Sequence, residues 1–362
     1  MIGSGSLSLP QAFAAIDYNT IILLFGMMIV VANLRLSGFF TLISGWVVEH
    51  AHRPAVLLAS IVVVSGFFSA FFVNDTMCLV LTPLVLEITR RLGRNPLPYL
   101  LAVAMAANIG SAATITGNPQ NMMIGSFSGI GYRAFAAALS PVALTGLVAL
   151  FLLLLFIYRS EFRQEPAMEV AHQSIRIDRV LLWKSLLISV AMIGFFFAGV
   201  PVAQVALVAG ALLLITRRVR PEMVYREIDW PLLVMFIGLF VLVAGVERAA
   251  LAADLLGAST RFGLDRTVVL SSWTALLSNI VSNVPAVLVF KPLLTHMSNP
   301  RHAWLVMAMS STLAGNLTIL GSLANMIVVE RARREVDISF WDYAKAGIPV
   351  TIVTLAIGMA IL

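Results

Sequence analysis

Two polar interruptions of apolar stretches hold the amide and hydroxyl side chains best suited to bind a small solute. The first covers residues 108–121 and reads NIGSAATITGNPQN, and the second covers residues 316–325 and reads NLTILGSLAN. Glycine and proline favour an unwound backbone, and Asn, Thr and Ser side chains donate and accept hydrogen bonds. We expect ten of these residues to bind the solute: Asn108, Thr114, Thr116, Gly117, Asn118, Asn121, Asn316, Thr318, Ser322 and Asn325.

Two shorter polar clusters, Asn74-Asp75-Thr76 and Ser282-Asn283-Val284-Pro285, interrupt two further apolar stretches. We interpret each cluster as the tip of a re-entrant hairpin near the middle of a membrane. The reason is length: a crossing needs about 20 apolar residues, and the stretch after each cluster is shorter than that. At these tips we expect solute contacts from Asn74, Thr76, Ser282 and Asn283.

Asp75 is the one acid expected deep in the membrane beside a hairpin tip. A charged carboxylate is costly in hydrocarbon, so acids at this depth commonly mark proton or ion pathways. We therefore predict that Asp75 is the proton-coupling residue, with Na⁺ bound together with Asn74 as the alternative coupling ion. The structural alternatives are that Asp75 caps the hairpin tip and that the other polar residues serve helix packing.

The composition places these residues in a membrane protein. Of 362 residues, 60% are apolar and 12% are charged, whereas soluble domains have about 25% charged residues. The single cysteine excludes a disulfide framework, and the sequence has no zinc-protease, nucleophile-elbow or phosphate-loop motif. We therefore expect no enzyme, no cofactor other than H⁺ or Na⁺ as coupling ion, no bound metal and no nucleic-acid partner.

The apolar segments predict an all-α polytopic fold with about eight crossings and two hairpins. Single crossings are expected at residues 19–42, 141–158, 181–198, 202–216, 229–250 and 345–362. The tracts 97–138 and 302–329 read as broken helices, and the tracts 55–88 and 267–295 read as hairpins. With this order of crossings, 17 of the 24 Lys and Arg residues share one face. Positive charge marks the cytoplasmic side, so we expect a multi-pass protein of the inner (plasma) membrane with both termini outside.

The polar breaks also repeat along the chain. The motif at residues 114–122, TITGNPQNM, returns at residues 318–326 as TILGSLANM, and Asn74 with Pro83 returns as Asn283 with Pro292. We expect a first repeat over residues 1–158, a cytoplasmic linker over 159–180 and a second repeat over 181–362. The two hairpins open to opposite sides, so the repeats are inverted. Inverted repeats with discontinuous helices are typical of secondary transporters.

At these breaks the sequence resembles the ion transporter superfamily of ArsB arsenite carriers, NhaD antiporters, citrate carriers and sodium-dicarboxylate carriers. It is especially similar to plant silicic-acid efflux transporters and their bacterial relatives in the ArsB-like branch. The segments that carry the resemblance are residues 74–76, 80–82, 107–114, 117–121, 282–285, 321–325 and 330–334.

This resemblance implies an elevator-type carrier, and for many members a homodimer in the lipid bilayer. Sodium-coupled dicarboxylate relatives carry Ser-Asn-Thr at both tips, whereas the first tip here carries an acid, which favours proton coupling. We therefore expect proton-coupled antiport that exports a small inorganic oxyacid or anion, such as arsenite or silicic acid. The alternatives are Na⁺- or H⁺-coupled uptake of an organic anion, citrate or a dicarboxylate, and a membrane scaffold or channel.

Overall fold

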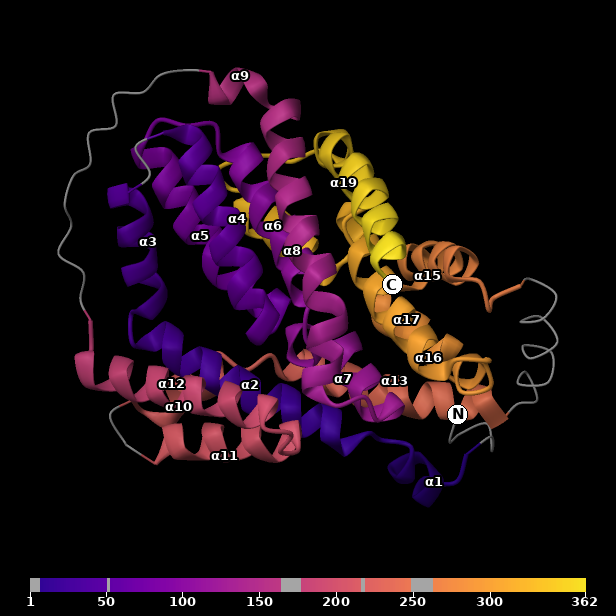
Figure 1. Cartoon of the computed structure of the whole chain (residues 1–362). Coiled ribbons are helices and arrows are strands. Elements are labelled where there is room, and N and C mark those ends of the chain that lie inside the picture. Colours follow the sequence, from indigo (N-terminus) through magenta and orange to yellow (C-terminus); the bar gives the residue numbers. More distant parts are fainter. Residues whose placement is uncertain (1–6, 51–52, 164–176, 216–218, 249–262) are drawn as a thin grey trace.

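The structure is a computed structural model that describes residues 7–50, 53–163, 177–215, 219–248 and 263–362. Throughout these residues the regular elements are helices, which confirms the predicted all-α class (Figure 1). Five of these helices are long and apolar enough to cross a membrane. The central part of the linker expected at 159–180 lies outside the described residues.

The first repeat consists of entry helices, a hairpin, a broken helix and a closing helix. Its elements are α1 (Leu9–Ala14), α2 (Tyr18–Leu36), α3 (Phe39–His50), α4 (Pro54–Phe71), α5 (Asn74–Arg91), α6 (Pro96–Ser111), η1 (Ile115–Gly117), α7 (Pro119–Ser128), α8 (Tyr132–Ile157) and α9 (Arg159–Phe162). Helices α4, α6 and α7 all begin with a proline. Proline is favourable there because an N–H in the first turn has no partner inside the helix, so its absence breaks no helical hydrogen bond.

The second repeat follows the same order after two additional helices. Its elements are α10 (Arg179–Phe197), α11 (Val202–Leu214), α12 (Pro221–Arg226), α13 (Trp230–Arg248), α15 (Thr267–Val281), α16 (Asn283–Leu294), α17 (Pro300–Ala314), η2 (Ile319–Gly321), α18 (Leu323–Ala332) and α19 (Phe340–Ile361). When each broken helix counts as one crossing, this order matches the predicted eight crossings and two hairpins.

The first expected crossing, residues 19–42, is not one continuous helix. Helix α2 ends at Leu36, and Gly38 has a φ of 84°, in the left-handed region that glycine adopts at little cost. The chain turns there and begins the separate helix α3. The closing helix of the first repeat also starts earlier than expected, at Tyr132, because Pro141 is accommodated inside α8.

Both hairpin tips lie at the level of the helix breaks. At the first tip, Nδ2 of Asn74 donates to Oδ1 of Asn108, close to the end of α6. At the second tip, the Asn283 amide, oriented to satisfy its hydrogen bonds, donates to the backbone oxygens of Ser311 and Gly321 on either side of the second break. Each hairpin tip therefore lies beside a break, as expected for a re-entrant hairpin, and α4 of the first hairpin is one of the five helices long enough to cross a membrane.

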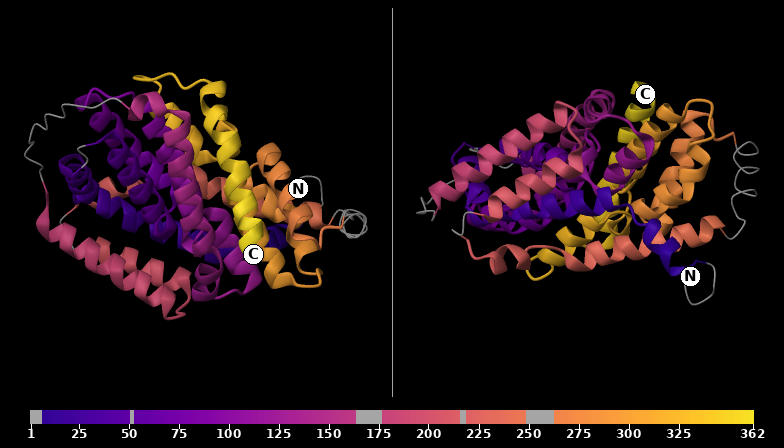
Figure 2. Two further views of the ribbon diagram at one scale, coloured as in Figure 1. Left: turned by 45° about the horizontal axis from the view of Figure 1, so that its top comes forward. Right: turned by 90° about the horizontal axis from the view of Figure 1, so that it is seen from below.

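The hairpin of each repeat packs against the broken helix of the other repeat. Helix α5 of the first hairpin packs against α18 of the second repeat, and α16 of the second hairpin packs against α7 of the first. Helix α4 lies tightly against α6, since a Cβ on Gly110 would overlap the backbone of Gly66. Helices α2, α10 and α11 pack together along one flank, where α10 and α11 run side by side in Figure 1 and in the right-hand view of Figure 2.

Candidate functional site

Asn108 is the centre of a buried hydrogen-bond network that joins the two repeats. Its Nδ2 donates to Oδ1 of Asn316 and to Oδ1 of Asn325, each at 2.9 Å. Its Oδ1 accepts from Nδ2 of Asn74 at 2.9 Å and from Oγ of Ser322 at 3.1 Å. All five side chains are buried. One amide therefore links the first hairpin, the first broken helix and the second break.

A matching set of bonds surrounds the first break. Nδ2 of Asn118 donates to Oγ of Ser111 at 2.9 Å and to Oγ1 of Thr312 at 3.2 Å. Asn118 and Ser322 are equivalent in the repeat, as are Asn108 and Thr312. Each break thus bonds across to the last helical turn before the other break. Gln120 also donates to Thr312, at 3.2 Å.

The unwound backbone at both breaks is held by the same device. Nδ2 of Asn121 donates to the backbone oxygens of Ser111 and Thr114, at 3.1 and 3.0 Å. In the second repeat, Nδ2 of Asn325 donates to the backbone oxygens of Gly315 and Thr318, at 2.7 and 2.9 Å. These carbonyls lack helical partners at a break, and a buried unpaired carbonyl is costly. The Nδ2 groups of both asparagines are therefore engaged by the protein itself.

Glycine at 117 is required by the tight turn. A Cβ at this position would overlap the backbone oxygen of Ser111. At the equivalent Gly321, the added carbon would lie 2.7 Å from Oδ1 of Asn279. Gly117, one of the predicted site residues, thus lets the backbone turn closely and offers no side chain to a solute.

Two of the three predicted threonines of the breaks, Thr114 and Thr318, bond to the first arms of the hairpins, and the third, Thr116, bonds to Thr114 and to α8. Oγ1 of Thr114 donates to the backbone oxygen of Ala70, and Thr116 pairs with Thr114 at 3.3 Å and with the Tyr132 hydroxyl at 2.9 Å. Oγ1 of Thr318 donates to Oδ1 of Asn279 at 3.3 Å. Their hydroxyls therefore already have protein partners at the edge of the network.

Five residues of this network were missed by sequence reasoning: Ser111, Gln120, Tyr132, Asn279 and Thr312. Asn279 had a usable signal, because it is an amide residue in the last turn of an apolar helix directly before the predicted tip at Ser282 and Asn283. Thr312 is the repeat partner of Asn108. Tyr132 begins a helix in an apolar stretch, and no sequence signal marks it.

The two hairpin tips differ in backbone and in charge. Ser282 has a φ of 77° with a ψ of 161°, a region that non-glycine residues occupy only with strain, and its side chain is exposed. At the first tip, Asp75 and Thr76 are partly buried on the first turn of α5. The residue equivalent to Asp75 at the second tip is the apolar Val284, so the first tip carries a carboxylate and the second tip carries none.

Three buried polar atoms of the network have no hydrogen-bond partner within the described part of the chain: Oδ1 of Asn74, Oδ1 of Asn121 and Nδ2 of Asn316. The side chains of Asn74 and Asn316 both bond to Asn108, so an acceptor and a donor stand beside the same central amide. This pair is suited to a solute that carries hydroxyl groups, because a hydroxyl both donates and accepts.

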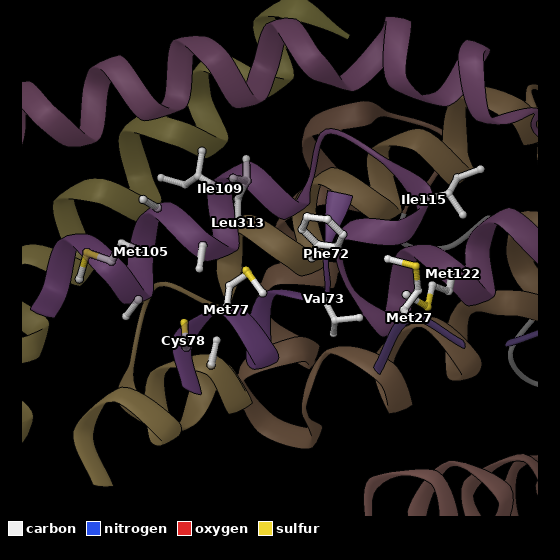
Figure 3. Close-up of a cluster of buried hydrophobic side chains, with 14 of the residues drawn as sticks. Met27, Phe72, Val73, Met77, Cys78, Met105, Ile109, Ile115, Met122 and Leu313 are labelled. Carbon is white, nitrogen blue, oxygen red and sulfur yellow. The ribbon is translucent and has the colours of Figure 1, made fainter. Parts of the chain in front are cut away.

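Apolar side chains enclose the polar network. Phe72 and Val73 precede the first tip, and Ile109 follows Asn108; all three are buried in the cluster of Figure 3 together with Leu313 and Met77. Across the described tips and breaks, residues 70–78, 108–121, 279–285 and 312–325, Asp75 is the one acidic or basic side chain. The network therefore offers hydrogen bonds in a low-dielectric setting with a single carboxylate at its edge.

Comparison with known proteins places the chain among membrane transporters. Residues 1–303 match the model of the citrate transporter family, CitMHS. The chain is 30% identical over 364 residues to a 46 kDa membrane protein of Mycobacterium leprae, covering 94% of this chain and 85% of that protein. It is 29% identical over 429 residues to the silicon efflux transporter LSI3 of Oryza sativa subsp. japonica, covering 98% and 88%.

A further relative, from Dictyostelium discoideum, bears the name arsB and is 25% identical over 478 residues, covering 100% of this chain and 85% of that protein. Among solved structures, the YdaH transporter of Alcanivorax borkumensis superposes with a TM-score of 0.63, covering 99% of this chain and 86% of that chain at 16% identity. That superposition supports the fold with its hairpins and breaks. By its family match and its curated relatives, the chain belongs to the citrate transporter (CitMHS) family of membrane transporters.

Proposed function

We propose that this transporter is a proton-coupled antiporter that exports a small hydroxylated inorganic oxyacid, such as silicic acid or arsenite. The observation that carries the proposal is the unpaired donor and acceptor beside Asn108, in a network whose one acid is Asp75. The name of the rice relative, a silicon efflux transporter, supports the choice of solute.

The solute binds at Oδ1 of Asn74 and Nδ2 of Asn316, which have no other partner among the described residues. Thr76, Ser282 and Asn283 stand at the tips, next to the breaks that the hairpins contact. A neutral acid needs no countercharge, which agrees with a network of amides and hydroxyls. Movement of both hairpins and both broken helices together, as an elevator, would carry this network across the membrane.

Asp75 carries the proton in this scheme. A carboxylate at membrane depth is costly when charged, so proton binding before reorientation lowers the cost of moving it through the apolar layer. Na⁺ as the coupling ion is the alternative, since Oδ1 of Asn74 and a carboxylate oxygen of Asp75 are both oxygen ligands. The proposed carrier acts without an enzymatic step or a bound cofactor beyond the coupling ion.

The basic residues set the proposed orientation. Arg90 and Arg91 end the first hairpin, and Arg94 lies in the loop after it. We place this end in the cytoplasm by the positive-inside tendency. Both termini then lie outside an inner (plasma) membrane. A homodimer in the bilayer, which the family resemblance implies, remains part of this proposal.

Reconstitution in liposomes tests solute and coupling together. With a pH gradient and no sodium, we expect silicic acid or arsenite to move against its own gradient, and citrate to stay in place. Asp75→Asn should abolish this uphill movement while solute exchange without a gradient continues. Uphill movement that persists in Asp75→Asn would refute the role of Asp75.

Uptake of citrate driven by Na⁺ or H⁺ is the second candidate, because the matching family model is named for citrate transport. A tricarboxylate calls for positive charge at the site. Lys291 is the basic residue of the second hairpin, but its Nζ lies over the Phe127 ring, 4.8 Å from the centroid, two helical turns past the tip. Citrate accumulation that requires sodium would favour this candidate over the metalloid antiporter.

A further inference from the structure

A cavity of about 270 Å³ lies between the first break and helices α2, α10 and α11. Its inner wall contains Ile115 of the break and Met122 near the start of α7, which are both buried in the apolar cluster of Figure 3. Asn19, on the first turn of α2, and Ser126 are exposed residues of its lining. The cavity therefore extends from the break to the surface.

Tyr132 joins this cavity to the polar residues of the break. It lines the cavity, and its hydroxyl pairs with Oγ1 of Thr116 at 2.9 Å. Its ring packs against two rings of α10, Phe196 and Phe197, with centroids 5.2 and 5.1 Å away. Both the rings and the hydrogen bond therefore fix the position of this buried side chain.

The hydrogen bonds that begin at Tyr132 all run in one direction. Oγ1 of Thr114 donates to the backbone oxygen of Ala70, which uses the one hydrogen of this hydroxyl. Thr116 must then be the donor in its pair with Thr114, and Tyr132 must be the donor in its pair with Thr116. The Tyr132 hydrogen is thus engaged, while its oxygen accepts no hydrogen bond from the described residues.

This direction leaves Tyr132 with an acceptor to offer and no donor. An acceptor binds a ligand with O–H groups, as a neutral oxyacid has, and does not bind a carboxylate, which only accepts. The rest of the inner lining is apolar, and none of the described residues that line the cavity carries a charge. An anion would therefore lose part of its hydration there without a countercharge.

We propose that this cavity is a second binding site for the hydroxylated solute, on the external side of the first break, and that the Tyr132 oxygen is its specificity-determining acceptor. The inference rests on the proposed function and its orientation, in which the turn between α10 and α11 lies at the external face. The solute leaves the Asn108 network past Ile115 and Met122, and occupies the cavity before its release.

Cysteine labelling tests whether the solute occupies the cavity. Asn19→Cys places a thiol in the lining, whereas Tyr18→Cys places one at the adjacent exposed residue, which is not part of the lining. The natural Cys78 is buried and should not react. We expect a membrane-impermeant methanethiosulfonate reagent, added outside, to block silicic acid exchange in Asn19→Cys only. Silicic acid should slow the labelling of Asn19→Cys, and citrate should not.

Tyr132→Phe tests the acceptor, because it removes the oxygen and keeps the ring. We expect the external silicic acid concentration for half-maximal exchange to rise about 3–10-fold, as for one lost hydrogen bond, with the cytoplasmic value unchanged. A purely structural role would change both values or the maximal rate. Tyr158→Phe is the matched control, since this hydroxyl, at the other end of α8, donates to the backbone oxygen of Asp342. It should leave the external value unchanged.

The outcomes separate this site from the proposed function. If silicic acid does not slow the labelling of Asn19→Cys, or if the label leaves exchange intact, the cavity is not a solute site and the role of Asp75 is unaffected. Slowed labelling without proton-driven uphill movement would overturn the proposed function and support the site. An unchanged external value in Tyr132→Phe would overturn its role as the acceptor.

Discussion

The two helix breaks share a backbone and differ in their surroundings. Thr114 and Thr318 have nearly the same dihedral angles, with φ of −138° and −135° and ψ of 164° at both. Yet all residues from 108 to 121 are buried, whereas residues 317–319 of the second break are partly exposed and Leu320 is 73% exposed. The repeated asparagines thus set the shape of a break, and the residues that are not repeated set its environment.

The central bonds give the largest expected difference between the breaks. Asn108→Ala removes four hydrogen bonds and leaves Asn74, Asn316 and Asn325 with additional unpaired amide atoms. We expect a loss of about 3 kcal/mol in the free energy of unfolding. The equivalent Thr312→Ala removes an acceptor of two bonds and should cost about half as much. Denaturation in detergent, followed by size-exclusion chromatography, measures both; equal losses would contradict the central role of Asn108.

The glycines at the breaks should respond in the same order. Gly117→Ala forces a carbon into the backbone oxygen of Ser111, which is fixed by the turn, so we expect a loss of about 2 kcal/mol. Gly321→Ala meets Oδ1 of Asn279, a side-chain atom, 2.7 Å away, as well as the Gly315 oxygen at 2.9 Å. Gly321→Ala should therefore lower the free energy of unfolding by less than Gly117→Ala does. The melting temperatures of the two purified variants measure this difference. A larger loss of stability for Gly321→Ala would contradict the expectation that the first break tolerates an added carbon less well.

The smallest expected effect has the opposite sign. Ser282→Gly removes the strain of a positive φ and should stabilise the protein by about 1 kcal/mol. Val73 precedes the first tip with a φ of −49°, so Val73→Gly relieves nothing, loses a buried side chain and should destabilise. A thermal-shift assay on both variants would show shifts in opposite directions; stabilisation by both would mean that the tips do not differ in strain.

Sequence reasoning located the breaks and tips because their polar residues recur against an apolar background. The fold class followed from the same pattern. The division of roles within the network did not, since only the structure shows that the Nδ2 groups of Asn121 and Asn325 bond to backbone oxygens. The strain at Ser282 was equally hidden, because serine gives no signal of a positive φ. Which asparagine atom stays unpaired depends on packing between segments some 200 residues apart.

Because the contacts around Asn108 join the two repeats, the network can form only after the second repeat has been synthesised. Asn108 and its hydrogen-bond partner Asn325 are 217 residues apart, so at roughly 5–20 residues per second the first repeat waits about 10–45 s for this partner to be synthesised. During that time the polar first tip has no second repeat to cover it. We therefore expect the first repeat to stay incompletely folded in the membrane until α18 is inserted. The hydrogen bonds of Asn108 to the second repeat can form only then.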